Sequence, residues 1–222
     1  MSGLIRSSIT RKVTMALSGL FLVLFLAQHL TINITSVISP DTFNEWSHFM
    51  GYNPLVQYIL QPVLIIGVVL HFVMGFVLEV QNSKARNIKY VKFNGNKNST
   101  WASRNMIVTG LVVLAFLGLH FYDFWVHEID YKYIESLPED PTRYYAETVE
   151  KFVPFWRTVI YVVAFVLLSL HLWHGFASSF QSIGVNNKYT PGLKTFTKIF
   201  AVAVPLGFIF IALYHHLNPI IH

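Results

Sequence analysis

The chain has 222 residues, of which 54% are hydrophobic and only 12% are charged, and its mean hydropathy is +0.49. A soluble domain usually carries about twice that share of charged residues. Cysteine is absent, which excludes disulfides, a thiolate-ligated iron–sulfur cluster within this chain and the C-x-x-C-H attachment of c-type haem. The composition therefore indicates an integral membrane protein, in which any redox cofactor is held non-covalently by nitrogen or oxygen ligands.

Five stretches without any Asp, Glu, Lys or Arg predict the membrane-spanning elements. They cover residues 13–40, 55–78, 105–122, 158–187 and 199–222. Because about 20 apolar residues cross a bilayer as a helix, we expect one all-α domain over residues 1–222. Its five transmembrane helices are expected at roughly 14–38, 55–80, 104–126, 156–182 and 197–217. The first apolar run is too long for a signal-peptide core of about 7–15 residues, so it is expected to be retained.

The charges of the connecting segments predict the orientation. The segments before the first helix, after the second and after the fourth are basic, whereas those after the first and the third are acidic. By the positive-inside rule the N-terminus is expected on the cytoplasmic side and the C-terminus on the far side. The net charge of +5 therefore needs no nucleic acid to explain it. The basic segments suit membrane lipid with anionic headgroups, or an acidic soluble partner on the inner face.

Four histidines lie well inside four different predicted helices: His29, His71, His120 and His171. An ionisable side chain at membrane depth is costly unless it faces protein or a cofactor. At a rise of 1.5 Å per residue, His29 and His120 lie roughly 22–24 Å from the inner end of the bundle, and His71 and His171 roughly 15–16 Å. Two neutral imidazoles facing each other suit the fifth and sixth positions of a haem iron. An interhelical hydrogen bond is the alternative for any one of them.

A local repeat accompanies two of these histidines. The segment Leu70–Phe76, LHFVMGF, resembles Leu170–Phe176, LHLWHGF. In both segments a glycine, Gly75 or Gly175, follows the histidine by four positions and so lies on the same helix face. A glycine leaves that face clear for a flat macrocycle, although small residues also let transmembrane helices pack closely.

With these residues in place, the chain resembles the cytochrome b subunit of succinate:quinone oxidoreductases. The resemblance is to the single-subunit, five-helix, di-haem form found with succinate dehydrogenases and fumarate reductases that use menaquinone. The matching residues are Gln28-His29-Leu30 with Asn33, His48-Phe49-Met50, His71 with Gly75, His120, and His171 with Gly175 and Ser178. The resemblance implies two non-covalent haem b groups. His71 and His171 would ligate the iron of the proximal haem, and His29 and His120 that of the distal one.

The resemblance also implies a location and partners. The chain would be a multi-pass subunit of the bacterial cytoplasmic membrane. An iron–sulfur subunit and a flavoprotein would dock on its cytoplasmic face, and FAD and the iron–sulfur clusters would lie only in these partners. The chain would be the membrane subunit of the enzyme and pass electrons between the iron–sulfur subunit and menaquinone, linking the tricarboxylic acid cycle to the respiratory chain.

The quinone site is expected near the distal haem, at the outer end of the bundle, where reduction needs a proton donor. Glu45 and His48 are the first candidates, with Asp123 and His127 behind them. A solvated segment is the alternative interpretation for each. Near the inner ends, Lys12, Ser18 and Ser178 are candidates to contact haem propionates.

Two other functions remain open from the sequence. One is the membrane cytochrome b of a hydrogenase or formate dehydrogenase, in which the ligating histidines would be distributed differently. The other is a transporter without haem that uses its histidines as proton relays. Against the transporter, no inverted repeat and no carboxylate near the predicted midplane are evident. An anchor without cofactors would leave the depth-matched histidines unexplained.

Overall fold

The structure is a computed structural model that describes residues 7–84 and 105–219, and these residues form helices without any strand. The all-α fold predicted from the sequence is therefore confirmed. Part of the basic segment after the second span lies outside the described residues, namely Arg86, Lys89, Lys92, Lys97 and Arg104, as does Arg6 near the N-terminus.

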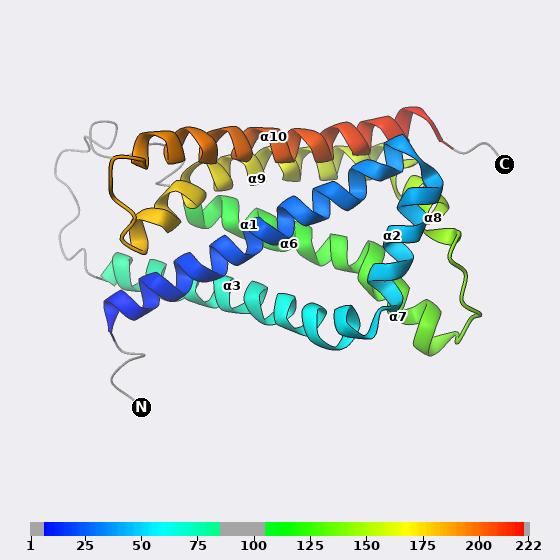
Figure 1. Cartoon of the computed structure of the whole chain (residues 1–222), viewed down its shortest axis with the longest axis horizontal. Coiled ribbons are helices and arrows are strands. Elements are labelled where there is room, and N and C mark those ends of the chain that lie inside the picture. The colour runs from blue at the N-terminus through cyan, green and yellow to red at the C-terminus, as the bar shows by residue number, and fades with distance from the viewer. Residues whose placement is uncertain (1–6, 85–104, 220–222) are drawn as a thin grey trace.

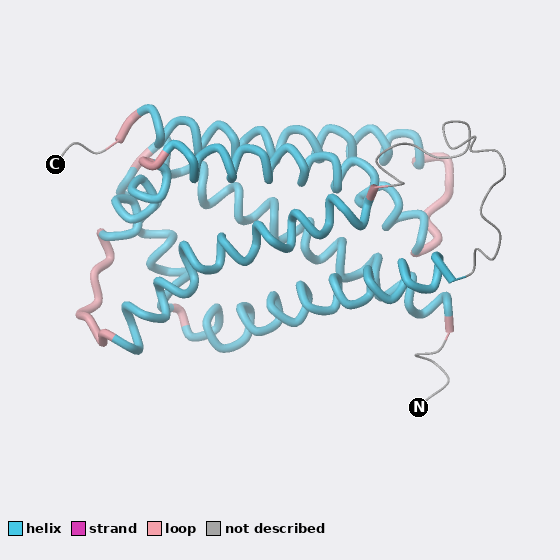
Figure 2. Tube along the Cα trace, turned by 180° about the vertical axis from the view of Figure 1, so that it is seen from behind, coloured by secondary structure: helices cyan, strands magenta, loops and turns pink. Residues whose placement is uncertain are grey.

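Five helical spans are long and apolar enough to cross a membrane, as the charge-free stretches predicted. They are α1 (Ser8–Ile38), then π-helical η1 (Val56–Leu60) continued by α3 (Gln61–Lys84), then the composite span Met106–Ile134, then α9 (Phe155–Ser182) and α10 (Thr190–Leu217). The composite span joins α6 (Met106–His120), π-helical η2 (Phe121–Val126), α7 (His127–Ile129) and π-helical η3 (Asp130–Ile134). Figures 1 and 2 show these spans running along the bundle, with the described loops at its two ends.

The outward faces of the spans are apolar. In the span Val56–Lys84 none of the most hydrophobic window is buried inside the protein. Leu24, Ile66 and Ile199 are more than half exposed. A soluble monomer rarely exposes so much contiguous apolar surface, whereas a bilayer covers it. The transmembrane character predicted from the composition is thus supported.

Two short amphipathic helices, α2 (Pro40–Tyr52) and α8 (Arg143–Phe152), lie at the same end of the bundle (Figure 1). The sequence predicted only a polar connection where α2 lies. The helix begins there because the Ser39 hydroxyl accepts a hydrogen bond from Thr42 N and Pro40 occupies the first turn. Asn44 Oδ1 accepts a hydrogen bond from Tyr145 N at 2.8 Å, which joins α2 to α8.

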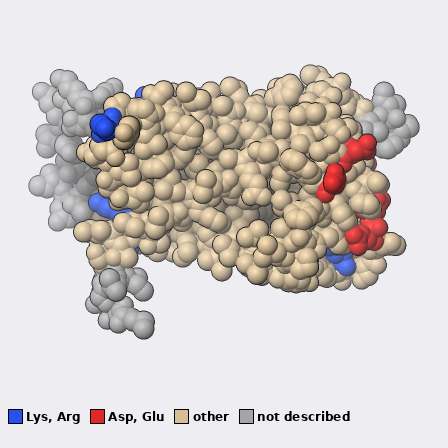
Figure 3. Space-filling model, in the orientation of Figure 1, with Lys and Arg blue, Asp and Glu red and all other residues tan. Residues whose placement is uncertain are grey.

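The charges divide between the two ends of the bundle. In Figure 3 the visible Asp and Glu side chains gather at the α2 and α8 end, and most visible Lys and Arg side chains lie at the opposite end. This is the asymmetry from which the orientation was predicted. We call the α2 and α8 end the outer end, and the end that holds the first turn of α1 the inner end.

Four spans are longer than expected. The first begins at Ser8 rather than near residue 14, and the second continues to Lys84 rather than ending near residue 80. The third continues to Ile134 rather than ending near residue 126, because Glu128 and Lys132 form an ion pair one turn apart that supports the helix beyond the apolar stretch. The fifth begins at Thr190 rather than near 197, with Pro191 in its first turn, where a missing N–H costs nothing.

The packing order of the spans determines where an interior space can form. Helix α1 contacts α3, α9 and α10, and α6 contacts α3 and α9. Helix α10 packs against α9 and α1 through an aromatic cluster that includes Phe165 and Phe208, whose rings stack 5.2 Å apart. The remaining helices α1, α3, α6 and α9 surround the interior of the bundle.

Candidate functional site

An elongated cavity of about 1100 Å³ lies between α1, α3, α6 and α9. Its lining includes all four histidines predicted from their depth, together with Gly75 and Gly175. Lys12 and Ser178 line its inner end, and Asp123 and His127 line its outer end. Most of the wall between these ends is aliphatic or aromatic, as in a site for a large flat ligand with few polar groups.

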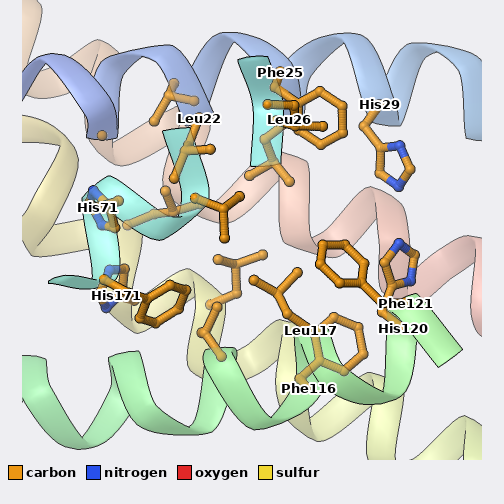
Figure 4. Close-up of a pocket in the computed structure, with 18 of the residues that line it drawn as sticks. Leu22, Phe25, Leu26, His29, His71, Phe116, Leu117, His120, Phe121 and His171 are labelled. Carbon is orange, nitrogen blue, oxygen red and sulfur yellow. The ribbon is translucent and has the colours of Figure 1, made fainter. Parts of the chain in front are cut away.

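The four histidines form two pairs across this cavity. The imidazole centroids of His71 on α3 and His171 on α9 are 6.3 Å apart, and the ring planes are inclined by 73°. We call these two the inner pair. His29 on α1 and His120 on α6, the outer pair, have centroids 5.7 Å apart and planes inclined by 88°. Figure 4 shows the pairs at different depths, with Leu22, Leu26 and Leu117 between them. The pairing is the one predicted from depth.

The spacing within each pair fits two axial ligands of one metal ion. With a metal–imidazole bond of about 2 Å and the ring centroid about 1 Å beyond the nitrogen, two imidazoles on opposite sides of a metal have centroids about 6 Å apart. Among the described residues, no group of three or more His, Asp or Glu side chains could hold a metal ion by itself. The residues therefore fit a planar cofactor that supplies its own equatorial ligands better than a bare ion such as zinc.

The outer pair is packed by aromatic rings. Phe25 stacks on His29 at 5.3 Å, and Phe116 stacks on His120 at 5.9 Å. Asn33 Nδ2 lies 3.4 Å from His29 Nδ1 but donates its shorter bond, 2.8 Å, to the His29 carbonyl in the same helix. His120 Nδ1 is buried and has no hydrogen-bond partner among the described residues. A buried ring nitrogen without a partner is costly in an apolar interior.

Two glycines that the sequence analysis missed lie against the inner pair. A Cβ at Gly19 would be 3.2 Å from His71 Cε1, and a Cβ at Gly110 would be 3.5 Å from His171 Cε1. The predicted glycines face methionines instead: a Cβ at Gly75 would be 3.8 Å from Met15 Cε, and one at Gly175 would be 3.4 Å from Met106 Cε. Helices α1 and α6 thus approach the histidines of α3 and α9 closely because position 19 or 110 has no side chain.

A repeat between α1 and α6 could have identified these positions. The residues Met15, Ser18, Gly19, Phe25 and His29 recur in the same order and at the same spacing as Met106, Thr109, Gly110, Phe116 and His120. With the matching histidine and glycine of α3 and α9, the pair α1 and α3 repeats as the pair α6 and α9. The two halves of the cavity are therefore built from equivalent residues.

A buried network of one ion pair and one hydrogen bond joins the third span to the fourth at the outer end. Asp123 is 1% exposed, accepts a hydrogen bond from Tyr161 OH at 2.8 Å and lies 3.0 Å from Arg157 Nη1. The Tyr161 ring centroid is 6.3 Å from that of His120. Asp123 therefore lines the cavity and is also held in place by Tyr161 and by the guanidinium of Arg157.

The first two quinone-site candidates lie apart from the cavity lining. Glu45 is exposed and lines a separate small pocket with Trp46, Phe49 and Met50. His48 Nε2 is 2.8 Å from Glu139 Oε1, and its ring stacks on Tyr52 at 4.6 Å. The structure thus brings Asp123 and His127, rather than Glu45 and His48, to the cavity. His127 also contacts α8, where its Nε2 lies 3.6 Å from Glu147 Oε1.

Arg143 organises a second network that the sequence did not reveal, above the outer end of the cavity. Its guanidinium donates to both Glu147 oxygens at 2.8 Å and to Glu128, and lies 3.9 Å from the Tyr131 ring centroid. Burial acts to lower the pKa of Arg143, but the hydrogen bonds and charges of Glu147 and Glu128 outweigh it and raise the pKa. Burial and the Glu128 charge raise the pKa of Tyr144 in turn. At neutral pH Arg143 is therefore cationic and Tyr144 neutral.

Comparisons of this chain with protein-family models, with curated proteins and with solved structures found no match. The function is therefore inferred from the residues of the chain and their geometry.

Proposed function

We propose that the chain is the di-haem cytochrome b membrane subunit of a succinate:quinone oxidoreductase in a bacterial cytoplasmic membrane. The observation that carries the proposal is the pair of histidine pairs, one above the other, inside a single cavity. His71 and His171 would ligate the proximal haem, and His29 and His120 the distal one. The complex would work as a succinate dehydrogenase or a fumarate reductase.

A bound haem b supplies reversible one-electron transfer at its iron. The chain's own residues provide ligation, orientation and exclusion of water. The four imidazoles approach in pairs from opposite walls, so each cofactor would be fixed from both faces. Leu22, Leu26 and Leu117 keep the space between the pairs apolar. Such an apolar shell limits solvent access and thereby influences the redox potential of the site.

The inner end suits acidic groups of the cofactor and an acidic partner. Lys12 and Ser178 line the cavity there and would contact the propionates of the proximal haem. Lys188, Lys194 and Lys198 follow in the segment between α9 and α10 and the first turns of α10. An iron–sulfur subunit would dock on this basic face, followed by the FAD-containing flavoprotein that oxidises succinate or reduces fumarate.

Menaquinone would exchange electrons with the distal haem at the outer end. Asp123 and His127 line that end of the cavity, which supports them ahead of Glu45 and His48 as groups that handle protons beside the quinone. Asp123 lies 3.0 Å from Arg157 Nη1 and accepts the Tyr161 hydrogen bond. His127 is the more accessible of the two and the better candidate for proton exchange with water.

Isolation of the affinity-tagged chain from its native membranes in mild detergent tests this assignment. We expect a flavoprotein and an iron–sulfur protein to co-purify, and added succinate to reduce the b-type absorbance of the preparation. The matched control is the same preparation with malonate, which competes with succinate at the partner's dicarboxylate site. A haem-containing preparation that hydrogen or formate reduces, and succinate does not, would instead assign the chain to a hydrogenase or formate dehydrogenase.

A further inference from the structure

Each inner histidine has a buried hydroxyl at its Nδ1 edge, and this hydroxyl comes from a different helix. Ser18 Oγ on α1 is 3.3 Å from His71 Nδ1 on α3. Thr109 Oγ1 on α6 is 3.3 Å from His171 Nδ1 on α9. Ser18 is 9% exposed and Thr109 is 2% exposed. Because Ser18 and Thr109 are equivalent positions of the repeat, the same contact is built twice.

The bonds that the two hydroxyls donate indicate which atom is the donor in each contact with an imidazole. Ser18 donates to the Met15 carbonyl at 3.0 Å, and Thr109 donates to the Met106 carbonyl at 3.0 Å. A hydroxyl has one hydrogen and two acceptor lone pairs. With that hydrogen directed to the carbonyl, the oxygen has lone pairs that can accept from the imidazole, and this favours the tautomer with the proton on Nδ1 for each inner histidine. The lone pair of Nε2 is then available to a metal.

Of the two histidine pairs, the inner pair has this arrangement. It also occurs outside the pairs, where Ser36 Oγ donates to the Asn33 carbonyl at 2.7 Å and lies 2.8 Å from Nε2 of His215 on α10. In the outer pair, His29 meets only an amide of its own helix at 3.4 Å, and His120 Nδ1 has no hydrogen-bond partner within the described residues. A hydroxyl bonded to a carbonyl three residues earlier is also common on helices without any histidine. Thr197 on α10 is such a case: it is fully buried and donates to the Lys194 carbonyl at 2.9 Å.

The neighbouring glycines support the contact geometrically. Gly19 follows Ser18, and Gly110 follows Thr109, and both lie against the Cε1 edge of the ring that the hydroxyl contacts. Each inner imidazole is thus bordered by a hydroxyl and a bare backbone from successive residues of the neighbouring helix. A ring bordered in this way has a defined rotation about its Cβ–Cγ bond as well as a defined tautomer.

We propose that Ser18 and Thr109 are the positioning residues of the inner haem site. They fix His71 and His171 as Nδ1–H tautomers with Nε2 toward the cavity, and they increase electron donation from both ligands. The proposal rests on the proposed function of the inner pair as haem ligands. Partners of this kind on the second nitrogen of a ligating histidine fix its orientation and raise its basicity.

Loss of these hydroxyls has a specific electronic consequence. A less basic imidazole stabilises ferric iron less, so the midpoint potential of the inner haem rises while that of the outer haem stays the same. The affinity of the inner site for haem falls as well, by about 10–100-fold for the loss of such a partner. A hydroxyl that only satisfied its own helix would change neither quantity at one haem alone.

The test is a spectroelectrochemical titration of the purified, haem-loaded chain, with electron paramagnetic resonance of the ferric state. The variants are Ser18→Ala and Thr109→Val, and the control is Thr197→Val, which removes a hydroxyl bonded in the same way without a histidine. We expect a positive shift of one potential, changed g-values for one haem and faster loss of one haem in the two variants. The conservative exchanges Ser18→Thr and Thr109→Ser, each of which installs the residue of the other half, should restore wild-type values.

The possible outcomes separate this proposal from the proposed function. A wild-type chain without haem overturns both. Two haems in the wild type, with unchanged potentials and haem retention in Ser18→Ala and Thr109→Val, overturn the role of the hydroxyls and leave the haem assignment standing. If the midpoint potentials of both haems shift together, or if Ser18→Thr and Thr109→Ser do not keep the wild-type values, these positions act through packing and the proposal is overturned.

Discussion

At the scale of single residues, Gly19 determines how closely α1 approaches His71. The side chain of Gly19→Val would begin 3.2 Å from His71 Cε1 and add two methyl groups beyond that point. We expect the ring to be displaced, and the haem content to fall toward one per chain with the spectrum of the outer haem retained. Gly118→Val is the matched control, because a Cβ at Gly118 meets nothing within 4 Å. Equal haem content in the two variants would contradict the close approach.

Arg143 is the residue on which the outer-end network depends. Arg143→Leu leaves Glu128 and Glu147 without their shared cation. Breaking a buried ion pair costs about 3–5 kcal/mol, and we expect about 3 kcal/mol here because both carboxylates are partly exposed. Thermal unfolding in detergent should show a lower midpoint than for Lys194→Leu, which removes the same charge from an exposed site. The pKa of Arg143 is raised and that of Glu128 is lowered by their hydrogen bonds and charges, so the stabilisation should be present at neutral pH and be lost as the pH falls through the folded pKa of Glu128.

The sequence was sufficient to find the histidines but not the residues that orient them. The pairing of His29 with His120 and of His71 with His171 followed from depth, because helical rise is nearly constant. Ser18 and Thr109 were not predicted as a matched pair, since a hydroxyl in a membrane helix usually bonds to its own backbone. Only the rotation of α1 about its axis decides that Ser18 faces His71, and depth carries no information on rotation. Arg143 was missed for a similar reason, because its carboxylate partners come from two separate helices.

At the scale of elements, close packing of α1 on α3 depends on Gly67. A Cβ at this position would lie 2.7 Å from Phe21 Cε1, and an aromatic ring cannot yield as a flexible side chain would. We expect Gly67→Val to lower the free energy of unfolding by about 1–3 kcal/mol, the usual cost of overpacking. Chemical or thermal unfolding in detergent measures this, with Gly118→Val again as the control. A stability equal to that of the control would contradict the close contact between Gly67 of α3 and Phe21 of α1.

The spans were predictable because a charged residue inside a bilayer is costly, so each charge-free stretch marks one of them. Their ends were less predictable. A helix continues into water wherever side chains support it, as Glu128 and Lys132 do in the third span. Helix α2 was expected only as a polar connection, although the Ser39-Pro40 sequence contains its start signal. The repeat of α1 in α6 was present in the sequence but becomes evident only when both helices are seen to line the same cavity.

At the scale of the whole molecule, the division of charge predicts the orientation in the membrane, and the absence of cysteine makes it simple to test. Lys188→Cys places a single thiol at the exposed inner end, and Glu135→Cys places one at the exposed outer end. In intact cells a membrane-impermeant maleimide should label Glu135→Cys, whereas Lys188→Cys should be labelled only after lysis. The reverse labelling pattern would show that the bundle has the opposite orientation, with its basic end on the far side of the membrane.

The two halves of the molecule, α1 with α3 and α6 with α9, each contribute one histidine to each pair. A site of this kind is complete only when both halves are folded together. Loss of one histidine should therefore empty one pair and leave the other intact, because the pairs share no ligand. This independence distinguishes two haem sites from a chain of histidines that relays protons.

The haem stoichiometry of the purified chain tests the central claim most directly. A dithionite-reduced minus oxidised spectrum with pyridine haemochrome quantification should give two b-type haems per wild-type chain. His71→Ala and His29→Ala should each retain one, with different absorption maxima for the haem that remains. A wild-type chain that contains no haem after expression with an adequate haem supply would contradict the account.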